Sequence, residues 1–295
     1  MKLSLDNAIA PLFVLIWSTG FVIARLAMPY VEPATFLFWR FIGVLAAMAA
    51  LNLAWRITWP RWAQVKHIAV AGILMQFGYL LGVWCAVRLG MTAGLAAIIV
   101  GLQPILTAWF AAWISEKVTP RQWIGLAFGF AGVALVVAEK ISFAHIPFIS
   151  YVLAFLALLS ITFGTLYQKK YCPVFDLRAG SSIQFGVSAV LCFFCMYFFE
   201  SGVMVWNAPV TIALLWSIIP LSIGSISLLF MMIRKGAATK VTSLLYLTPP
   251  TTAIMAWFLF GEPFTLLMAL GLGLTMTGVI MVNARQTNTV ATIAE

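Results

Sequence analysis

Charged side chains are scarce in this chain of 295 residues: Asp, Glu, Lys and Arg together account for 8% of it, and 63% of its residues are hydrophobic. Soluble globular proteins carry about 25% charged residues. A water-soluble fold of this size has no means of covering its surface with so few. The main solvent of the fold must therefore be the lipid bilayer, and we expect an integral membrane protein.

Other absences exclude several kinds of chemistry. No cluster of His, Cys and carboxylate residues has the spacing of a metal site, and no Gly-rich phosphate loop suggests ATP use. Neither a Gly-x-Ser-x-Gly motif nor a pair of acids on one helix face points to hydrolysis. The four cysteines form no disulfide framework, because three of them lie inside apolar runs. We therefore predict no metal, no cofactor and no enzymatic activity.

The apolar residues gather in ten long runs, separated by short breaks of Pro, Gly and charged residues. A helix that spans a bilayer needs about 20 mostly apolar residues. A transmembrane β-barrel would need alternating segments of about ten residues, and these runs are longer and do not alternate. We therefore predict an all-α membrane protein with ten transmembrane helices, near 8–28, 34–54, 65–87, 91–114, 121–138, 147–168, 180–199, 210–232, 239–260 and 264–283.

The basic residues indicate the orientation. The first apolar run lacks a small-x-small cleavage site, so we interpret it as an uncleaved helix. With the N-terminus inside, most of the 17 Lys and Arg residues fall on the cytoplasmic side, and only Arg25, Arg88 and Lys140 fall on the other. Short loops follow this positive-inside bias well. We therefore expect both termini in the cytoplasm and the chain in the cell inner membrane, and we attribute its charge of +9 to topology and not to nucleic-acid binding.

The sequence also shows an internal repeat when it is aligned with a shifted copy of itself. A shift of 146 residues aligns Arg88 with Arg234, Pro104 with Pro250 and Glu116 with Glu262, and a shift of 144 aligns Glu32 with Asp176. Each half then holds five helices, an odd number, so the second half enters the membrane from the opposite side. We predict two inverted repeats, residues 1–143 and 144–285, followed by a short tail, 286–295. Inverted repeats are a transporter architecture with a site near the midplane between the halves.

Several ordered motifs then suggest a family. They are the stretches from Pro104 to Glu116 and from Pro250 to Glu262, the opening Trp17-Ser-Thr-Gly-Phe, the Trp39-Arg40-Phe of the second helix, and Gly-rich fifth and tenth helices. With them the chain resembles the drug/metabolite transporter superfamily, specifically its EamA-type members, over nearly its whole length. The resemblance implies export of small metabolites, with amphipathic amino acids a leading subgroup. The second half departs from the first by carrying Gln184 at the place of Arg40.

The function expected from repeats and resemblance together is secondary transport by alternating access, exporting amino acids or related amphipathic compounds. Efflux of drugs or other lipophilic compounds is an alternative, and a polytopic membrane enzyme is a third reading from another class. None of the eight acidic residues lies in the middle of a predicted helix. Because proton relays in membranes usually use buried carboxylates or histidines, we hypothesise that transport is facilitative or coupled in another way.

Polar and aromatic residues inside the predicted helices are the candidates for a substrate cavity. Arg40 is the most informative, because a charge within the membrane must face protein or water; it either binds a substrate carboxylate, braces a gate, snorkels outward or caps carbonyl groups. Each of the others serves either the cavity or helix packing. The candidate set is Trp17, Arg40, Gln76, Tyr79, Gln103, Tyr167, Ser225 and Tyr246.

Three further groups have expected structural roles. Pro104, Pro249 and Pro250 should break helices four and nine, as hinges or as ordinary kinks. Glu116 and Glu262 should pair, cap a helix or brace the repeat. The Gly-rich fifth and tenth helices should pack closely. The expected partners are a small-molecule substrate and the lipid bilayer, with no nucleic acid, and the chain is either a monomer or a homodimer formed through these Gly-rich helices.

Overall fold

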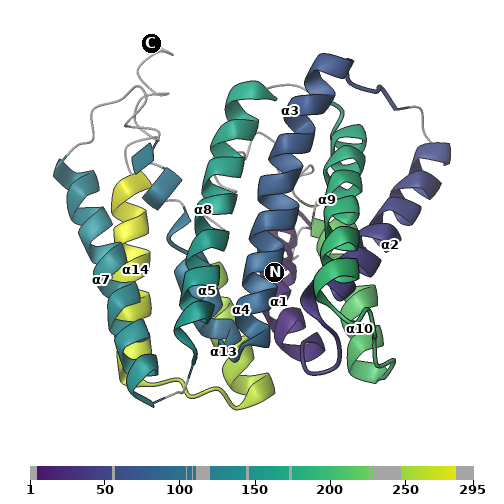
Figure 1. Ribbon diagram of the computed structural model, residues 1–295. Helices are drawn as coiled ribbons and strands as arrows, with labels where there is room; N and C mark the ends of the chain where they lie inside the picture. The colour runs from purple at the N-terminus through teal and green to yellow at the C-terminus, as the bar shows by residue number, and fades with distance from the viewer. Residues whose placement is uncertain are drawn as a thin grey trace, which may run out of the picture.

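The computed structural model describes residues 5–54, 57–103, 105–107, 109–110, 120–143, 146–172, 175–225, 228 and 247–283. Within these ranges the chain is helical, and its β-structure is limited to one isolated bridge between Val31 and Met204. The all-α fold class is therefore confirmed. The helices form one bundle, shown in Figure 1. They are α1 (Leu5–Ala27), α2 (Pro33–Ala54), α3 (Trp62–Gly72), η1 (Ile73–Gly78), α4 (Tyr79–Arg88), α5 (Ala93–Val100), α7 (Pro120–Phe143), α8 (Phe148–Tyr171), α9 (Leu177–Phe199), α10 (Ala208–Trp216), η2 (Ser217–Gly224), α13 (Thr248–Phe260) and α14 (Leu266–Asn283).

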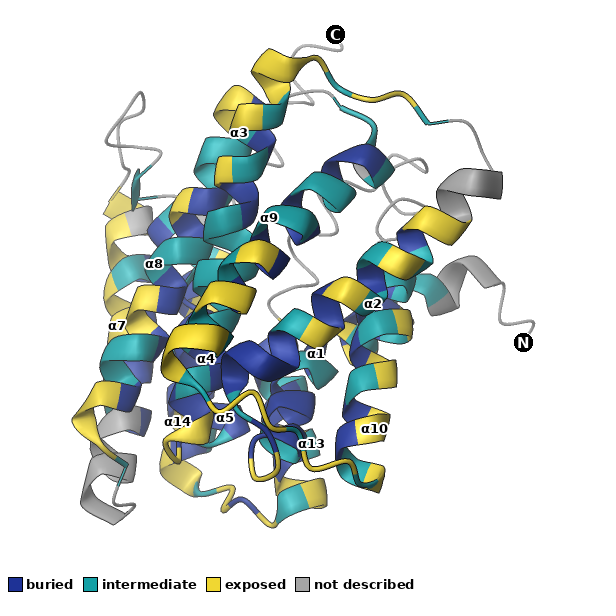
Figure 2. Ribbon diagram, turned by 45° about the vertical axis from the view of Figure 1, so that its right-hand side comes forward, coloured by how far each residue is buried: buried dark blue, intermediate teal, exposed yellow. Residues whose placement is uncertain are grey.

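Five helical stretches are long and apolar enough to cross a membrane by length and composition: Ile9–Ala27, Pro33–Ala50, Trp62–Arg88, Phe148–Tyr171 and Arg178–Phe199. Shorter apolar helices include Trp123–Val136, Ala208–Gly224 and Leu266–Met281. Large apolar side chains on the outside of the bundle are exposed, among them Phe258 at 81% and Phe199 at 84% (Figure 2). This outward apolar surface is what a lipid-embedded protein presents. The full count of ten spans and their orientation stay predictions.

Local capping chemistry fixes several helix boundaries. The side chain of Thr92 accepts a hydrogen bond from the backbone N–H of Leu95 at the start of α5. Asn207 does the same for Val210 in the first turn of α10. These are the side chains preferred at helix N-caps, because they satisfy backbone donors that have no partner within the helix. The α13 helix ends at Gly261, whose φ of 63° is a left-handed conformation that favours glycine.

The helices that the repeat makes equivalent pack against one another. The α2 helix packs on α9, α5 on α13, and α7 on α14. Further contacts come in matched sets as well, since the contact of α3 with α8 has a counterpart in that of α1 with α10, and the contact of η1 with α8 has one in that of η2 with α1. This arrangement is the one expected when a two-fold axis in the membrane plane relates the halves.

Two π-helical segments interrupt the bundle at matching places. The η1 segment ends at Gly78 and the η2 segment at Gly224, and these two residues are separated by the same 146 positions as Arg88 and Arg234. The η2 segment also contains Pro220, which removes a backbone donor from the hydrogen-bond ladder. π-Helical turns are rare and occur frequently at functional sites. They therefore direct attention to the third helix of each half.

Glycines bring α7 and α14 into backbone contact. A Cβ atom added at Gly132 would lie 2.4 Å from the carbonyl oxygen of Gly271, and one added at Gly278 would lie 2.6 Å from the backbone nitrogen of Gly129. The two helices run side by side at one edge of the bundle (Figure 1). The glycines predicted to pack closely thus join the two halves of a single chain, and a homodimer through them stays an untested prediction.

Two of the three prolines predicted to break helices lie within the described residues, and their role as hinges or kinks stays a prediction. Pro249 and Pro250 lie in the first turn of α13, where proline is tolerated because its missing N–H would have no helical partner. Pro249 also lines a small, mostly apolar pocket together with Ile98, Gly101 and Thr275. Pro104 lies outside the described residues, as do Glu116 and Tyr246.

Candidate functional site

The two ends of the bundle differ in charge. We call one the acidic end, because Glu32, Glu200 and Glu262 lie in its loops; the connection from α13 to α14 runs along it in Figure 1. We call the opposite end the basic end. Its described residues include Arg61, Lys66, Lys169, Lys170 and Arg178.

At the acidic end, two carboxylates of the second half cap helices of the first half. The backbone N–H groups of Ala34 and Thr35 donate to the Glu200 carboxylate at 2.8 and 2.7 Å, and the Thr35 hydroxyl donates to it at 2.8 Å. Glu262, which is 8% exposed, accepts from the N–H groups of Ala93 and Gly94 at 3.0 and 3.3 Å. A negative charge at a helix N-terminus is favourable because the helix dipole is positive there. Both contacts therefore hold the two halves together at this end.

The loops of the acidic end add a second link. Glu32 accepts hydrogen bonds from the backbone N–H and the hydroxyl of Ser201 at 2.7 and 2.6 Å. The Val31–Met204 bridge lies beside it, and the N–H of Val205 donates to the carbonyl oxygen of Tyr30 at 3.1 Å. The segment before α2 is thus joined to the segment after α9.

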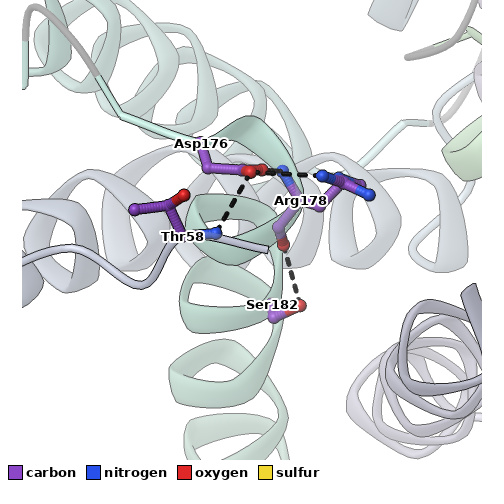
Figure 3. Close-up of polar contacts among 4 residues, drawn as sticks. All are labelled: Thr58, Asp176, Arg178 and Ser182. Atoms are coloured by element: carbon purple, nitrogen blue, oxygen red, sulfur yellow. Dashed lines mark hydrogen bonds and ion pairs between the residues drawn. The ribbon is translucent and has the colours of Figure 1, made fainter. Parts of the chain in front are cut away.

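The basic end repeats that link in inverted form. Asp176, which precedes α9, accepts from the backbone N–H of Thr58, which follows α2, at 3.5 Å (Figure 3). Asp176 also caps α9 through the N–H of Arg178 and forms an ion pair with the Arg178 side chain at 3.3 Å. Burial raises the pKa of Asp176, but the hydrogen bonds from Arg178 and Thr58 lower it by more than burial raises it. The pKa of Asp176 therefore lies below the usual 3.8.

Arg40 contacts η2 and lies near Tyr79, the residue directly after η1. It is 5% exposed, and its Nη2 donates to the Ser222 hydroxyl oxygen in η2 at 3.3 Å. The Ser222 hydroxyl in turn donates to the carbonyl oxygen of Ser217 at 2.8 Å. Tyr79 lies within electrostatic reach of the guanidinium. Arg40 therefore faces inward, and the snorkelling alternative does not apply to it.

The described surroundings of Arg40 leave it incompletely paired. Its Nε is buried and has no hydrogen-bond partner among the described residues. The one ion pair in that part of the chain is Arg178 with Asp176, so no described carboxylate neutralises Arg40. Residue 184, the counterpart in the second half, is satisfied: the amide nitrogen of Gln184 donates to the Gln168 side-chain oxygen at 2.7 Å.

The other predicted cavity residues fall into separate groups. Gln76 lies within η1, and the hydroxyl of Ser225, directly after η2, donates to the carbonyl oxygen of Pro220 at 3.5 Å. These two share the π-helical region with Arg40 and Tyr79. Trp17 is 36% exposed, and its ring packs on Phe13 of its own helix.

Two predicted residues form polar contacts elsewhere. The Gln103 amide donates to the Thr165 hydroxyl of α8 at 3.0 Å. The Tyr167 hydroxyl lies 2.8 Å from His67 Nδ1, close to the basic end, where Tyr171 stacks on the His67 ring. The structure thus places four of the seven described candidates in or beside the π-helices and leaves the other three apart.

Sequence reasoning missed the role of Glu200. In the sequence it follows a long apolar run and precedes Ser201 and Gly202, a pattern typical of a loop. Its partners at the start of α2 lie about 165 positions earlier in the chain, beyond the reach of any local capping signal. The alignment of Glu32 with Asp176 in the repeat was the one available sign that acidic residues beside α2 and α9 have matching places in the two halves.

Comparison with known proteins identifies relatives over the whole chain. A family model described as the EamA-like transporter family matches residues 8–138 and again 148–284. An uncharacterized transporter of Bacillus subtilis, YvbV, is 28% identical over 92% of this chain and 89% of its own length. The uncharacterized inner membrane transporter YedA of Escherichia coli K12 is 22% identical over 95% of this chain and 90% of its own.

Two relatives have a name that refers to cargo, one in Salmonella typhimurium and one in Escherichia coli K12. A probable amino-acid metabolite efflux pump of Salmonella typhimurium is 26% identical over 56% of this chain and 54% of its own length. A solved crystal structure covers 98% of both chains with a TM-score of 0.65 at 18% identity, which shows a shared fold alone.

Proposed function

Because the chain belongs to the EamA-like transporter family, we propose that this multi-pass transporter of the inner membrane exports small metabolites, above all amino acids and related amphipathic compounds. The observation that carries the choice of cargo is the likeness to proteins named probable amino-acid metabolite efflux pumps in Salmonella typhimurium and Escherichia coli. The buried Arg40, a cation suited to a carboxylate, agrees with it.

The proposed mechanism is alternating access between the two halves, residues 1–143 and 144–285, with the basic end in the cytoplasm. The pairing of equivalent helices supports it, as does the double match of the family model. In the described conformation, Glu200 and Glu262 of the second half are bound to α2 and α5 of the first. Opening of the acidic end requires these contacts to break, so they favour the conformation in which that end is closed.

The proposed transport uses no relay of acids in the middle of the helices. Within the described ranges, Glu32, Glu200, Glu262 and Asp176 all lie at helix ends or in loops, and Glu139 lies in the last part of α7. Hydrogen-bonded carboxylates at the ends hold the structure together, whereas a relay needs ionisable groups within the span.

The cargo is tested by release from proteoliposomes loaded with a panel of labelled amino acids. Vesicles that contain the protein should release particular amino acids faster than protein-free vesicles. Release of lipophilic dyes but of no amino acid would replace amino-acid export with efflux of lipophilic compounds.

The mechanism is tested by locking the acidic end. Residues opposite each other in an antiparallel bridge have Cα atoms about 4.5–5.5 Å apart, which suits a disulfide. The double variant Val31→Cys/Met204→Cys should therefore crosslink the halves under oxidation, stop release, and recover on reduction. The single variants control for the four native cysteines. Unchanged release from the fully oxidised double variant would refute an opening of this end during transport.

A further inference from the structure

We propose that the guanidinium of Arg40 is the binding group for a carboxylate of the transported compound, and that the region between η1 and η2 is where this carboxylate is held. The inference rests on the proposed function, since it assigns a chemical class to the cargo. It commits to compounds with a free carboxylate, and it predicts that their amides are poor substrates.

The first argument is the missing counter-charge. A charged group within a membrane is costly unless it is paired or hydrated. Arg40 is 5% exposed, and no described carboxylate forms an ion pair with it. Each of the other Lys and Arg residues in the described part of the chain lies in a loop or near a helix end. The guanidinium of Arg40 therefore lacks a counter-charge among the described residues, and a bound anionic ligand would supply it.

The second argument is the set of unused donors. Arg40 Nε and the Ser217 hydroxyl are both buried and have no partner among the described residues. They belong to one small cluster, because the Ser217 carbonyl accepts from Ser222, whose oxygen accepts from Arg40. Buried donors without acceptors are costly, and a carboxylate supplies two oxygens that match the fork of a guanidinium.

The third argument is the weakness of the existing contact. The distance of 3.3 Å from Arg40 Nη2 to the Ser222 hydroxyl oxygen is long for a hydrogen bond from a charged donor. A carboxylate bound by Arg40 would replace a long contact to a neutral acceptor with a shorter one to a charged acceptor. The hydrogen bond from Ser222 to Ser217 does not involve Arg40 and stays in place.

The fourth argument is the asymmetry between the halves. Gln184 occupies the matching position on α9, and its amide nitrogen is paired with Gln168. Among the described residues of this region there is one guanidinium and no second cation, which matches the single negative charge of a carboxylate. A phosphate dianion would leave a net negative charge buried among the described residues, which is unfavourable.

The test measures binding separately from transport. Purified protein in detergent is heated with matched pairs of amino acids and their amides, over a series of side chains from small to aromatic. For at least one pair, the acid should raise the melting temperature of the wild-type protein and the amide should not. In Arg40→Gln the preference for the acid should fall by about tenfold to a hundredfold in apparent affinity. Arg40→Lys, which keeps the charge without the fork, should retain part of it.

The control is Gln184→Ala, which alters the matching position and should keep the full preference for the acid. If no acid binds better than its amide, or if folded Arg40→Gln and Arg40→Lys keep the wild-type preference, the proposal is wrong and Arg40 is a structural brace. Binding of acids without release from vesicles would leave this inference standing and overturn the proposed export. Release that is equally fast for acids and amides would do the reverse.

Discussion

Two of the helix pairs that join the halves of this protein, α7–α14 and α2–α9, do so by different means. The α7–α14 pair is held by glycines, which let the backbones touch at Gly132 and Gly271. The α2–α9 pair is tied at its ends by carboxylates, Glu32 and Glu200 at one end and Asp176 at the other. Its middle carries Arg40 and Gln184, which contact polar groups on other helices. The α7–α14 interface thus rests on backbone packing, whereas the α2–α9 interface rests on side-chain hydrogen bonds that can break and re-form.

The largest expected effect comes from blocking the glycine interface. In Gly132→Val, the new side chain would meet the Gly271 carbonyl oxygen at 2.4 Å and the Thr275 nitrogen at 2.7 Å, both backbone atoms that cannot move aside. Overpacking of this kind costs about 1–3 kcal/mol. The melting temperature in detergent should fall by several degrees. The matched control is Gly273→Val on α14, where no atom lies within 4 Å of the added Cβ. Equal melting of both variants would contradict the described contact.

The second effect comes from removing a cap of the α2–α9 pair. Glu200→Ala leaves two backbone donors of α2 and the Thr35 hydroxyl without their acceptor. The expected loss is about 1–2 kcal/mol of stability, as for other helix N-caps. Thermal unfolding in detergent measures it. Glu32→Ala is the comparison, because its hydrogen bonds go to exposed Ser201 and should contribute less. A larger loss in Glu32→Ala would reverse this ranking.

A smaller effect is expected at the neutral position of the pair. Gln184→Ala removes the hydrogen bond to Gln168 within a buried site, so about 1 kcal/mol of stability should be lost. Transport rates at saturating substrate should stay at the wild-type level. A strong fall in the rate with an unchanged melting temperature would place Gln184 itself within the binding site and remove the asymmetry between Arg40 and Gln184.

The smallest effect is a pH dependence at the basic end. The pKa of Asp176 is lower in the folded chain than its usual 3.8. Its contribution to stability is therefore complete above that value and is lost as the pH falls through the folded pKa. Melting curves of the wild-type protein should decline more steeply below about pH 4 than those of Asp176→Asn. Arg178→Met, which removes the partner side chain, should flatten the profile in the same way; parallel curves for all three proteins would contradict the assignment.

The sequence predicts the helices well because long apolar runs bounded by Pro, Gly and charge permit little else in a bilayer. For Arg40 the same reasoning leaves an inward and a snorkelling position open, and it is the structure that shows the side chain to be buried. Trp17 shows the limit, because an all-apolar helix gives no periodic signal to separate a lipid-facing side from a protein-facing one, and its ring is 36% exposed. The π-helical segments also leave no pattern in such runs. Their positions depend on packing between helices, and the repeat becomes informative about them only after one of the two is known.

The π-helical segments have a mechanical consequence. A π-helical turn is an irregularity in the hydrogen-bond ladder of a helix. This irregularity can move along the helix when neighbouring hydrogen bonds are exchanged one at a time. Each step turns the adjoining part of the helix about its axis while both ends stay anchored. A π-helical segment lies at the matched place in each half, at Ile73–Gly78 and at Ser217–Gly224. The second segment carries Ser222, whose hydroxyl oxygen accepts a hydrogen bond from Arg40. We therefore expect strain applied at the ends of these helices to be relieved at the π-helical segments, beside the groups proposed to bind the cargo.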